Sequence, residues 1–471
     1  MKCKCLIKTN LILIILLTIN FQIFAQKQGV LSLEEIHSIQ KDFKLDAATK
    51  ASMNALSNTS DIRKIVLNRQ TAGKFLHQFK YKVPTVGITD QKSSGRCWMF
   101  TGLNVFRQKA IKKLNVKKFE FSENYLFFWD QFEKANLFLE TVIKHAQEPM
   151  ENRYNEWLFK NPIGDGGVWN SFANLAEKYG LVPKDVMPET ANSENTRWLS
   201  KILKRKLREY GFELRKMVFQ KSNSKNLSAR KKEMMKDVYR ILALNLGIPP
   251  IEFEWRYTNK DGKISALKKY TPKSFAKEVI GEIDFTDYVM LMNDPTRPYY
   301  KLYEIENDRN VLEGRNWIYV NLPNEEIKKF AIASIKNKEA MYASCDVGKQ
   351  MNSEDGILDL ENYDFESLYG IKFSMNKKER IATFESGSSH AMTLMAVDVD
   401  ENEKPRMWQF ENSWGASSGH EGFLTFTDKW FDEYMFRLVV QKKFLNEKTI
   451  KLLNTKPTML PPWDPMFSFE K

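Results

Sequence analysis

The chain has 471 residues, which at roughly 100–200 residues per domain predicts two to four structural units. Hydrophobic residues make up 42% and charged residues 28%, with a mean hydropathy of −0.48. This balance excludes a multi-span membrane protein and argues against wholesale disorder. The net charge of +13 is compatible with nucleic acid, anionic lipid or acidic substrates, but the basic runs at 201–208 and 230–236 are typical of solvated helix faces, the interpretation we favour.

The first 25 residues have the pattern of a secretory signal peptide. Lys2, Lys4 and Lys8 precede a short apolar stretch at 11–19, and we expect cleavage after Ala25. An uncleaved membrane anchor is the alternative, although so short an apolar stretch does not span a bilayer. The sequence therefore predicts a secreted or periplasmic protein without stable membrane insertion.

The cysteines bound the redox chemistry of the mature chain. Removal of the signal peptide takes away Cys3 and Cys5 and leaves Cys97 and Cys345. Two cysteines do not make a disulfide scaffold, so they either form one bridge or include a working thiol.

The first half of the mature chain is predicted to be mainly helical. Residues 26–85 form an N-terminal helical segment, with Ser32 and Glu35 at capping-box spacing. Apolar periodicity predicts a buried helix that begins near Cys97, within a helical region at 86–130. The long middle at 131–340 is expected to continue this region and to add an inserted helical domain, with helices near 195–216 and 228–246 and a short strand at 288–292.

The last part of the chain changes period. Short runs at 390–399, 407–412, 422–427 and 435–441 are separated by polar or glycine-rich turns, which predicts an antiparallel sheet within 341–450. The final segment at 451–471 contains four prolines (Pro457, Pro461, Pro462 and Pro465) and is predicted to be an extended arm.

A turn at 90–96 delivers Cys97 to the start of the predicted apolar helix. Unpaired N–H groups and the helix dipole stabilise a thiolate at such a position, which raises its nucleophilic fraction. The Gln91 side-chain amide can point to the same place and, with the Cys97 backbone N–H, form a two-donor oxyanion hole. For Cys97 alone, a buried structural cysteine is the ordinary explanation.

Two further residues supply what a thiol nucleophile needs. His390 opens one predicted strand and Asn412 ends the next. On adjacent strands the Asn412 oxygen can accept from one imidazole nitrogen and set the tautomer, while the other nitrogen faces the thiol. Trp414 can shield that bond from water. A core histidine and a simple turn explain each segment alone, but the three segments together favour a thiol catalytic site.

Taken in order, Gln91, Cys97-Trp98, Ser389-His390-Ala391 and Asn412-Ser413-Trp414-Gly415 resemble the papain-like cysteine peptidases. Segments at 165–169, 177–184, 193–197, 345–349 and 463–466 resemble the bleomycin hydrolase and aminopeptidase C branch of that family. The resemblance implies an α+β fold with a papain-like two-lobe core, a helical lobe and an antiparallel β lobe, large helical insertions and a C-terminal arm that enters the cleft. One departure is Ser94, which stands where ordinary family members carry a cysteine.

The resemblance also implies roles for individual residues, and it requires no metal or cofactor. The catalytic set is Cys97 as nucleophile, His390 as general base and acid, Asn412 as the residue that orients His390, and Gln91 as oxyanion donor. The substrate-binding set is Gly166, Gly167, Trp414 and Lys471.

A cysteine aminopeptidase that acts on peptides with a free N-terminus is the function implied. Family members form homohexamers and can trim their last residue, here Lys471, and nucleic acid is not expected as a partner of an exported protein. A different class, a basic protein that binds nucleic acid or an anionic surface on an inactive peptidase fold, is the alternative. A third possibility keeps the thiol chemistry but transfers the acyl group to an amine.

Overall fold

The computed structural model describes residues 29–71, 75–464 and 466, and these fall into two units. The smaller unit holds the helices α2 (Leu33–Asp42), α3 (Ala47–Ser57), α4 (Arg63–Val66) and α14 (Phe365–Tyr369). Its first helix starts as predicted, because Ser32 accepts from the Glu35 N–H and the Glu35 carboxylate accepts from the Ser32 N–H. The predicted signal peptide lies outside the described residues. No helix among the described residues is long and apolar enough to cross a membrane.

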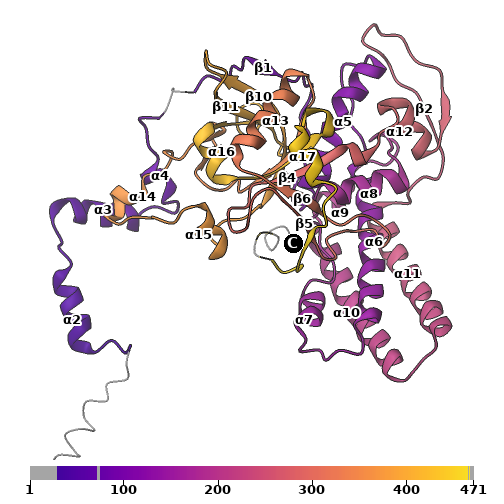
Figure 1. Cartoon of the computed structure of the whole chain (residues 1–471), viewed down its shortest axis with the longest axis horizontal. Coiled ribbons are helices and arrows are strands. Elements are labelled where there is room, and N and C mark those ends of the chain that lie inside the picture. The colour runs from indigo at the N-terminus through magenta and orange to yellow at the C-terminus, as the bar shows by residue number, and fades with distance from the viewer. Residues whose placement is uncertain (1–28, 72–74, 465, 467–471) are drawn as a thin grey trace, which may run out of the picture. The chain divides into compact units, whose positions relative to one another are not determined.

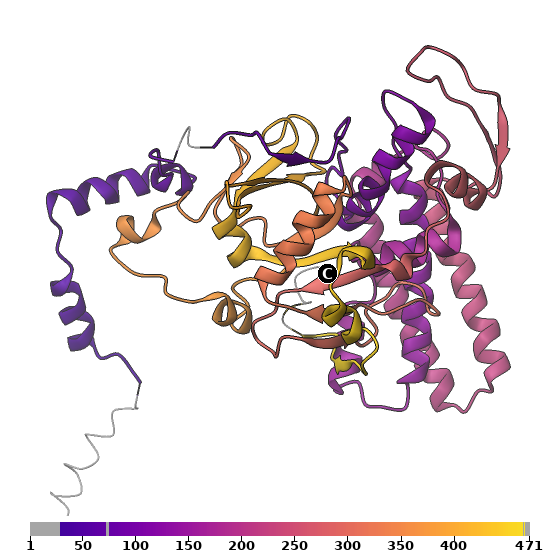
Figure 2. The ribbon, with the colours of Figure 1, turned by 45° about the horizontal axis from the view of Figure 1, so that its top comes forward.

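The first half of the larger unit is mainly helical. Its long helices α6 (Glu123–Lys144), α10 (Arg197–Phe219) and α11 (Ser224–Leu246) lie side by side (Figures 1 and 2). Shorter helices complete this part: α5 (Cys97–Leu114), α7 (Arg153–Lys160), α8 (Trp169–Tyr179), α9 (Ala191–Glu194) and α12 (Pro272–Ile280). The predicted helices near Cys97, at 195–216 and at 228–246 are thereby confirmed.

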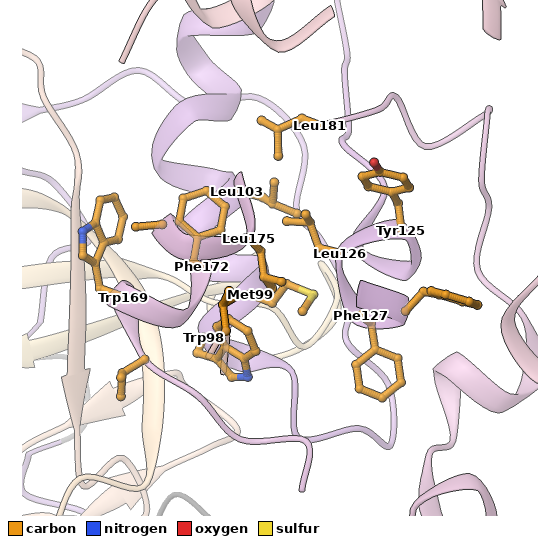
Figure 3. Close-up of a cluster of buried hydrophobic side chains, with 14 of the residues drawn as sticks. Trp98, Met99, Leu103, Tyr125, Leu126, Phe127, Trp169, Phe172, Leu175 and Leu181 are labelled. Atoms are coloured by element: carbon orange, nitrogen blue, oxygen red, sulfur yellow. The ribbon is translucent and has the colours of Figure 1, made fainter. Parts of the chain in front are cut away.

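A buried apolar cluster joins the front of α5 to α6 and α8. Figure 3 shows Trp98 and Met99 of α5 close to Phe172 and Leu175 of α8. The helices approach closely at Gly102, where an added Cβ would lie 2.5 Å from the Phe172 ring. Because the first turn of α5 packs against two helices, the position of Cys97 is tied to the whole helical core.

The second half of the larger unit is built on a mixed sheet. Its strands, in spatial order, are β14 (Thr458–Leu460), β5 (Lys301–Ile305), β6 (Ile318–Asn321), β4 (Tyr288–Met292), β13 (Met435–Gln441), β7 (Met341–Cys345), β10 (His390–Val399), β11 (Pro405–Glu411), β12 (Phe423–Thr427), β9 (Ile357–Leu358) and β8 (Met351–Asn352), with β1 (Tyr81–Lys82) on β10. A small separate sheet pairs β2 (Phe253–Trp255) with β3 (Lys268–Tyr270). The predicted strands at 288–292, 390–399, 407–412, 422–427 and 435–441 are confirmed.

The elements that remain pack on or beside the sheet. They are the helices α13 (Asn324–Lys336), α15 (Lys377–Ala382), α16 (Asp428–Tyr434) and α17 (Glu447–Leu452), with the short 3-10 turns η1 (Phe285–Asp287) and η2 (Lys442–Phe444). Side chains of α13 and α16 share a second apolar core with the central strands. The sheet therefore has its own core, distinct from the cluster around α5.

The sheet departs from the sequence prediction in two respects. It takes β5 and β6 from the middle of the chain, where the strand at 288–292 (β4) was the one strand predicted, and it contains parallel pairs, among them β4 with β6. β6 lies between β4 and β5; it pairs antiparallel with β5 and parallel with β4. Pairing of this kind depends on contacts far apart in the chain.

The N-terminal segment also differs from the prediction, since helix ends at Val66 in a stretch expected to be helical to residue 85. Tyr81 and Lys82 instead pair with Val397 and Ala396 as β1. An available edge of β10 satisfies the backbone groups of this stretch, so tertiary pairing overrides local propensity.

Part of the predicted C-terminal arm is extended: α17 runs to Leu452, and Thr458–Leu460 then form β14. After β14 pairs in parallel with β5, Asp464 forms a 2.7 Å ion pair with Arg297. The Met466 carbonyl accepts a 3.1 Å hydrogen bond from Arg437. Lys471, the predicted end of the substrate site, lies outside the described residues.

Candidate active site

Cys97 is the first residue of α5 and is half-buried. The residue before it, Arg96, gives the helix no side-chain cap. The Met99 and Phe100 N–H groups donate to the Arg96 carbonyl, and the dipole of α5 places partial positive charge at the thiol, which favours the thiolate form. Arg96 itself is buried and forms a 3.0 Å ion pair with Glu189, which holds the turn before Cys97 in place.

The turn before Cys97 is closed by bonds between near neighbours. The Gln91 amide nitrogen donates to the Ser94 carbonyl at 2.7 Å, and the Ser94 hydroxyl donates to the Gln91 carbonyl at 2.6 Å. An amide nitrogen carries two N–H donors, so the bond to Ser94 leaves one for a ligand. Ser94, the departure from the family pattern, thus closes the turn that carries the predicted oxyanion donor.

His390 and Asn412 meet across the sheet, with 2.8 Å between the imidazole Nε2 and the Asn412 Oδ1. The same Oδ1 accepts from the backbone N–H of Ser413 at 2.8 Å. Because a backbone N–H only donates, the oxygen of the amide must face it, and Nε2 of neutral His390 must carry the proton. This tautomer leaves Nδ1 as the nitrogen that can accept a proton.

Burial governs the charge state of His390. Its side chain is enclosed, and desolvation lowers its pKa to about 4, against the smaller opposing effect of the Asn412 hydrogen bond. The Trp414 ring stacks on the imidazole with 4.7 Å between centroids, so it covers the His390–Asn412 pair. A neutral imidazole at neutral pH is the form that can take a proton from a thiol.

Backbone pairing joins the two sides of the site. The Gln91 N–H donates to the Ser413 carbonyl at 2.9 Å, and Asp90 pairs with Trp414 as an isolated bridge. A buried ion pair adds a second link, because Arg107 of α5 contacts Glu411, the neighbour of Asn412. These contacts set the distance between the helix that carries Cys97 and the strand that carries Asn412.

A cleft of about 680 Å³ contains both sides of the predicted site. Among its lining residues are Gln91, Cys97, Gly166, Gly167 and His390. The structure thus brings these five predicted residues to one opening, while Asn412 and Trp414 lie behind His390.

Gly167 is required by packing in the wall of this cleft. A Cβ added there would lie 2.6 Å from the Trp98 indole. The indole nitrogen of Trp98 in turn donates to the Asp165 carbonyl at 2.7 Å. The loop at 165–167 is therefore seated directly on the side chain that follows Cys97.

Three positioning residues were not singled out from the sequence. Asp165 accepts from the Gly95 N–H at 3.2 Å and from the hydroxyls of Thr196 and Ser200. Lys134 of α6 donates to the Gly164 carbonyl at 2.9 Å and to the Gly166 carbonyl. The third is Arg107. Asp165 adjoins the glycine pair, which was a usable signal, but nothing in the local sequence marks Lys134 or Arg107.

Cys97 and Cys345 do not form a disulfide with each other. Cys345 is fully buried and lies opposite His390 in the β7–β10 register. Burial raises the pKa of the Cys345 thiol well above its usual range, so this residue stays protonated. Of the two thiols, the half-buried Cys97 is the one that lines the cleft.

The comparisons with known proteins agree with this architecture. The model of the Peptidase C1-like family matches residues 30–467. Human (Homo sapiens) bleomycin hydrolase is 41% identical over 422 residues, which cover 87% of this chain and 92% of that protein. Aminopeptidase C of Lactobacillus delbrueckii subsp. lactis is 38% identical over 441 residues, covering 93% of this chain and 98% of that protein.

A solved structure extends the likeness to three dimensions. PepW from Lactobacillus rhamnosis HN001 matches with a TM-score of 0.90 at 36% identity, covering 93% of this chain and 99% of that chain. This chain therefore belongs to the Peptidase C1-like family and has the papain-like peptidase fold. The resemblance to the bleomycin hydrolase and aminopeptidase C branch is confirmed.

Proposed function

We propose that this protein is a cysteine aminopeptidase that releases N-terminal residues from peptides. The observation that carries the proposal is the shared cleft, where Cys97 begins a helix and His390 carries an available Nδ1. The names of the relatives, bleomycin hydrolase and aminopeptidase C, support the same activity. Nothing in the comparisons favours the alternative of a nucleic-acid binding protein.

In the proposed mechanism, Nδ1 of His390 takes the proton of Cys97, and the thiolate attacks the scissile carbonyl carbon. The Cys97 backbone N–H and the remaining N–H of the Gln91 amide stabilise the oxyanion. Collapse of the tetrahedral intermediate breaks the C–N bond, and His390 returns the proton to the leaving amine. Water, deprotonated by His390, then attacks the thioester and frees both the acyl product and Cys97.

Asn412 is proposed to keep the imidazole in the productive tautomer through both half-reactions, with Trp414 excluding water from their hydrogen bond. Gly166 and Gly167 are proposed to pair with the substrate backbone at the cleft wall. Lys471 and the arm that bears it are proposed to limit the cleft to substrates with a free N-terminus.

The deciding experiment compares an unblocked aminoacyl fluorogenic amide with its N-acetylated form under reducing conditions. We expect turnover of the free amine only, with a loss of at least about 10⁴-fold in Cys97→Ala. Thermal unfolding of Cys97→Ala is the control for folding. Iodoacetamide should label Cys97 at the same rate at which activity is lost, and it should leave buried Cys345 unlabelled. Silence from reduced, folded protein would refute the peptidase, and equal cleavage of both substrates would refute the restriction to free N-termini.

Three further parts of the proposal have direct tests. Added amine nucleophiles should leave hydrolysis as the main route, because an acyl transferase would instead yield the amide product. Mass spectrometry of the purified protein should show cleavage after Ala25, as export requires, and loss of Lys471. Light scattering should give the mass of a homohexamer.

A further inference from the structure

Four basic side chains of α10 line the same cleft as Cys97 and His390: Arg197, Lys201, Lys204 and Arg208. Their spacing of four, three and four residues places them on one face of the helix. Three of them belong to the basic run that the sequence predicted to be a solvated helix face. In the structure, this face lines the cleft.

The described residues that line the cleft carry little negative charge to balance this face. Among the described lining residues, Asp165 is the one carboxylate, and it is already bonded to Gly95, Thr196 and Ser200. No described carboxylate lies within salt-bridge distance of the four bases. Arg208 donates to the backbone carbonyls of Phe159 and Lys160, which are neutral groups and do not balance its charge.

The arrangement is unfavourable for the isolated helix. Arg197 and Lys201, and likewise Lys204 and Arg208, are like charges four residues apart, a spacing that destabilises a helix. Lys206, which lies on the same helix outside the cleft lining, forms an ion pair with Glu209 at 2.7 Å. An anion bound in the cleft would reduce this repulsion. Because the four bases line the same cleft as Cys97, that anion can be an acidic group of the substrate.

We propose that the cleft-facing bases of α10 select peptide substrates that carry acidic side chains near the cleaved N-terminus. This specificity rests on the aminopeptidase function proposed above. Charge-assisted hydrogen bonds from lysine or arginine to a carboxylate are stronger than neutral ones, and they discriminate Glu from the isosteric Gln. The scissile bond would still be broken by the groups described above.

The test is a competition between free-amine pentapeptides that differ only by Glu or Gln at residue one, two or three. Mixing each pair in one reaction measures the ratio of their kcat/KM values directly. We expect a preference for Glu of about tenfold at one or more positions at low ionic strength, declining toward one as salt screens the charges. The Gln peptides serve as the internal measure of peptidase activity.

The variant Lys201→Gln/Lys204→Gln should reduce the Glu preference several-fold while the Gln peptides are still hydrolysed. Arg205→Gln/Lys206→Gln is the matched control, because it removes the same charge from the same helix outside the cleft lining. This control should keep the full preference. Both pairs of substitutions change exposed or half-exposed side chains, so folded protein is expected for both.

Several outcomes would overturn the proposal. A ratio near one at all three positions, with Gln peptides turned over, would refute the selectivity but leave the peptidase intact. No turnover of any peptide would instead refute the proposed function. An unchanged ratio in Lys201→Gln/Lys204→Gln, with new cleavage of N-acetylated peptides, would show that the bases hold the C-terminal arm. Competitive inhibition by a single-stranded oligonucleotide, with no Glu preference, would point to polyanion binding.

Discussion

The two sides of the cleft hold their functional groups by different means. On the helical side, Gln91 and Cys97 belong to one turn, which is closed by bonds across three residues and fastened by Asp165. On the sheet side, His390 and Asn412 come from different strands and meet only because β10 and β11 pair in one register. The comparison teaches that the turn and helix start of the nucleophile are formed locally and then fixed by packing, whereas its base meets its partner only through long-range strand pairing.

The link between the two sides is a buried ion pair. Arg107 and Glu411 are both about 1% exposed, and Arg107 also donates to the carbonyls of Val86 and Gly87. Burial raises the pKa of Glu411, and the guanidinium opposes that shift. Breaking this link is the most severe way to separate the two sides.

Arg107→Met should therefore have the largest effect, a loss of about 3–5 kcal/mol in the free energy of unfolding, because it leaves the Glu411 charge buried and unpaired. Urea denaturation measures this loss. The matched variant Arg107→Met/Glu411→Gln removes both charges and should regain a large part of the stability. A loss below about 1 kcal/mol in the single variant would contradict this account of the link.

The sheet side should also respond to pH through His390. Its pKa is lowered from about 6.5 to about 4 by burial, so the unfolded chain binds a proton between these values while the folded chain does not. The contribution of His390 to the free energy of unfolding is thus complete above pH 6.5. It is lost as the pH falls from 6.5 to 4, by up to about 3 kcal/mol. Unfolding free energies measured between pH 7 and 4 should fall less in His390→Gln, and equal slopes would contradict the assignment.

The smallest effect is expected on the helical side, from Asp165→Asn. The substitution keeps one oxygen for the Gly95 N–H, and the new amide can donate to the Ser200 hydroxyl. We expect a loss of about 1 kcal/mol in stability and a several-fold decrease in kcat. The pH dependence of unfolding should match that of the unsubstituted protein. A change in that dependence would show that the two sides are not held independently.

Much of the helical side could be predicted from the sequence. The start of α5 at Cys97 follows from polar turn residues before an apolar periodic run. On the sheet side, the start of β10 at His390 follows from a change of period. By contrast, the sequence did not predict β1, β5 or β6, which lie in stretches expected to be helical, and it predicted β4 only as an isolated short strand. Their places depend on which edges are open after the rest has folded, which local propensity does not encode.

The same division holds for the site. By itself the sequence determined the chemical groups of the site and their order, because the turn, the helix start and the strand ends are local features. Tertiary structure alone decided that Arg107 opposes Glu411, that Lys134 holds the glycine loop, and that one basic face of α10 borders the cleft. These contacts join residues far apart in the chain, and their charges acquire a role only when folding fixes which partners and how much water they face.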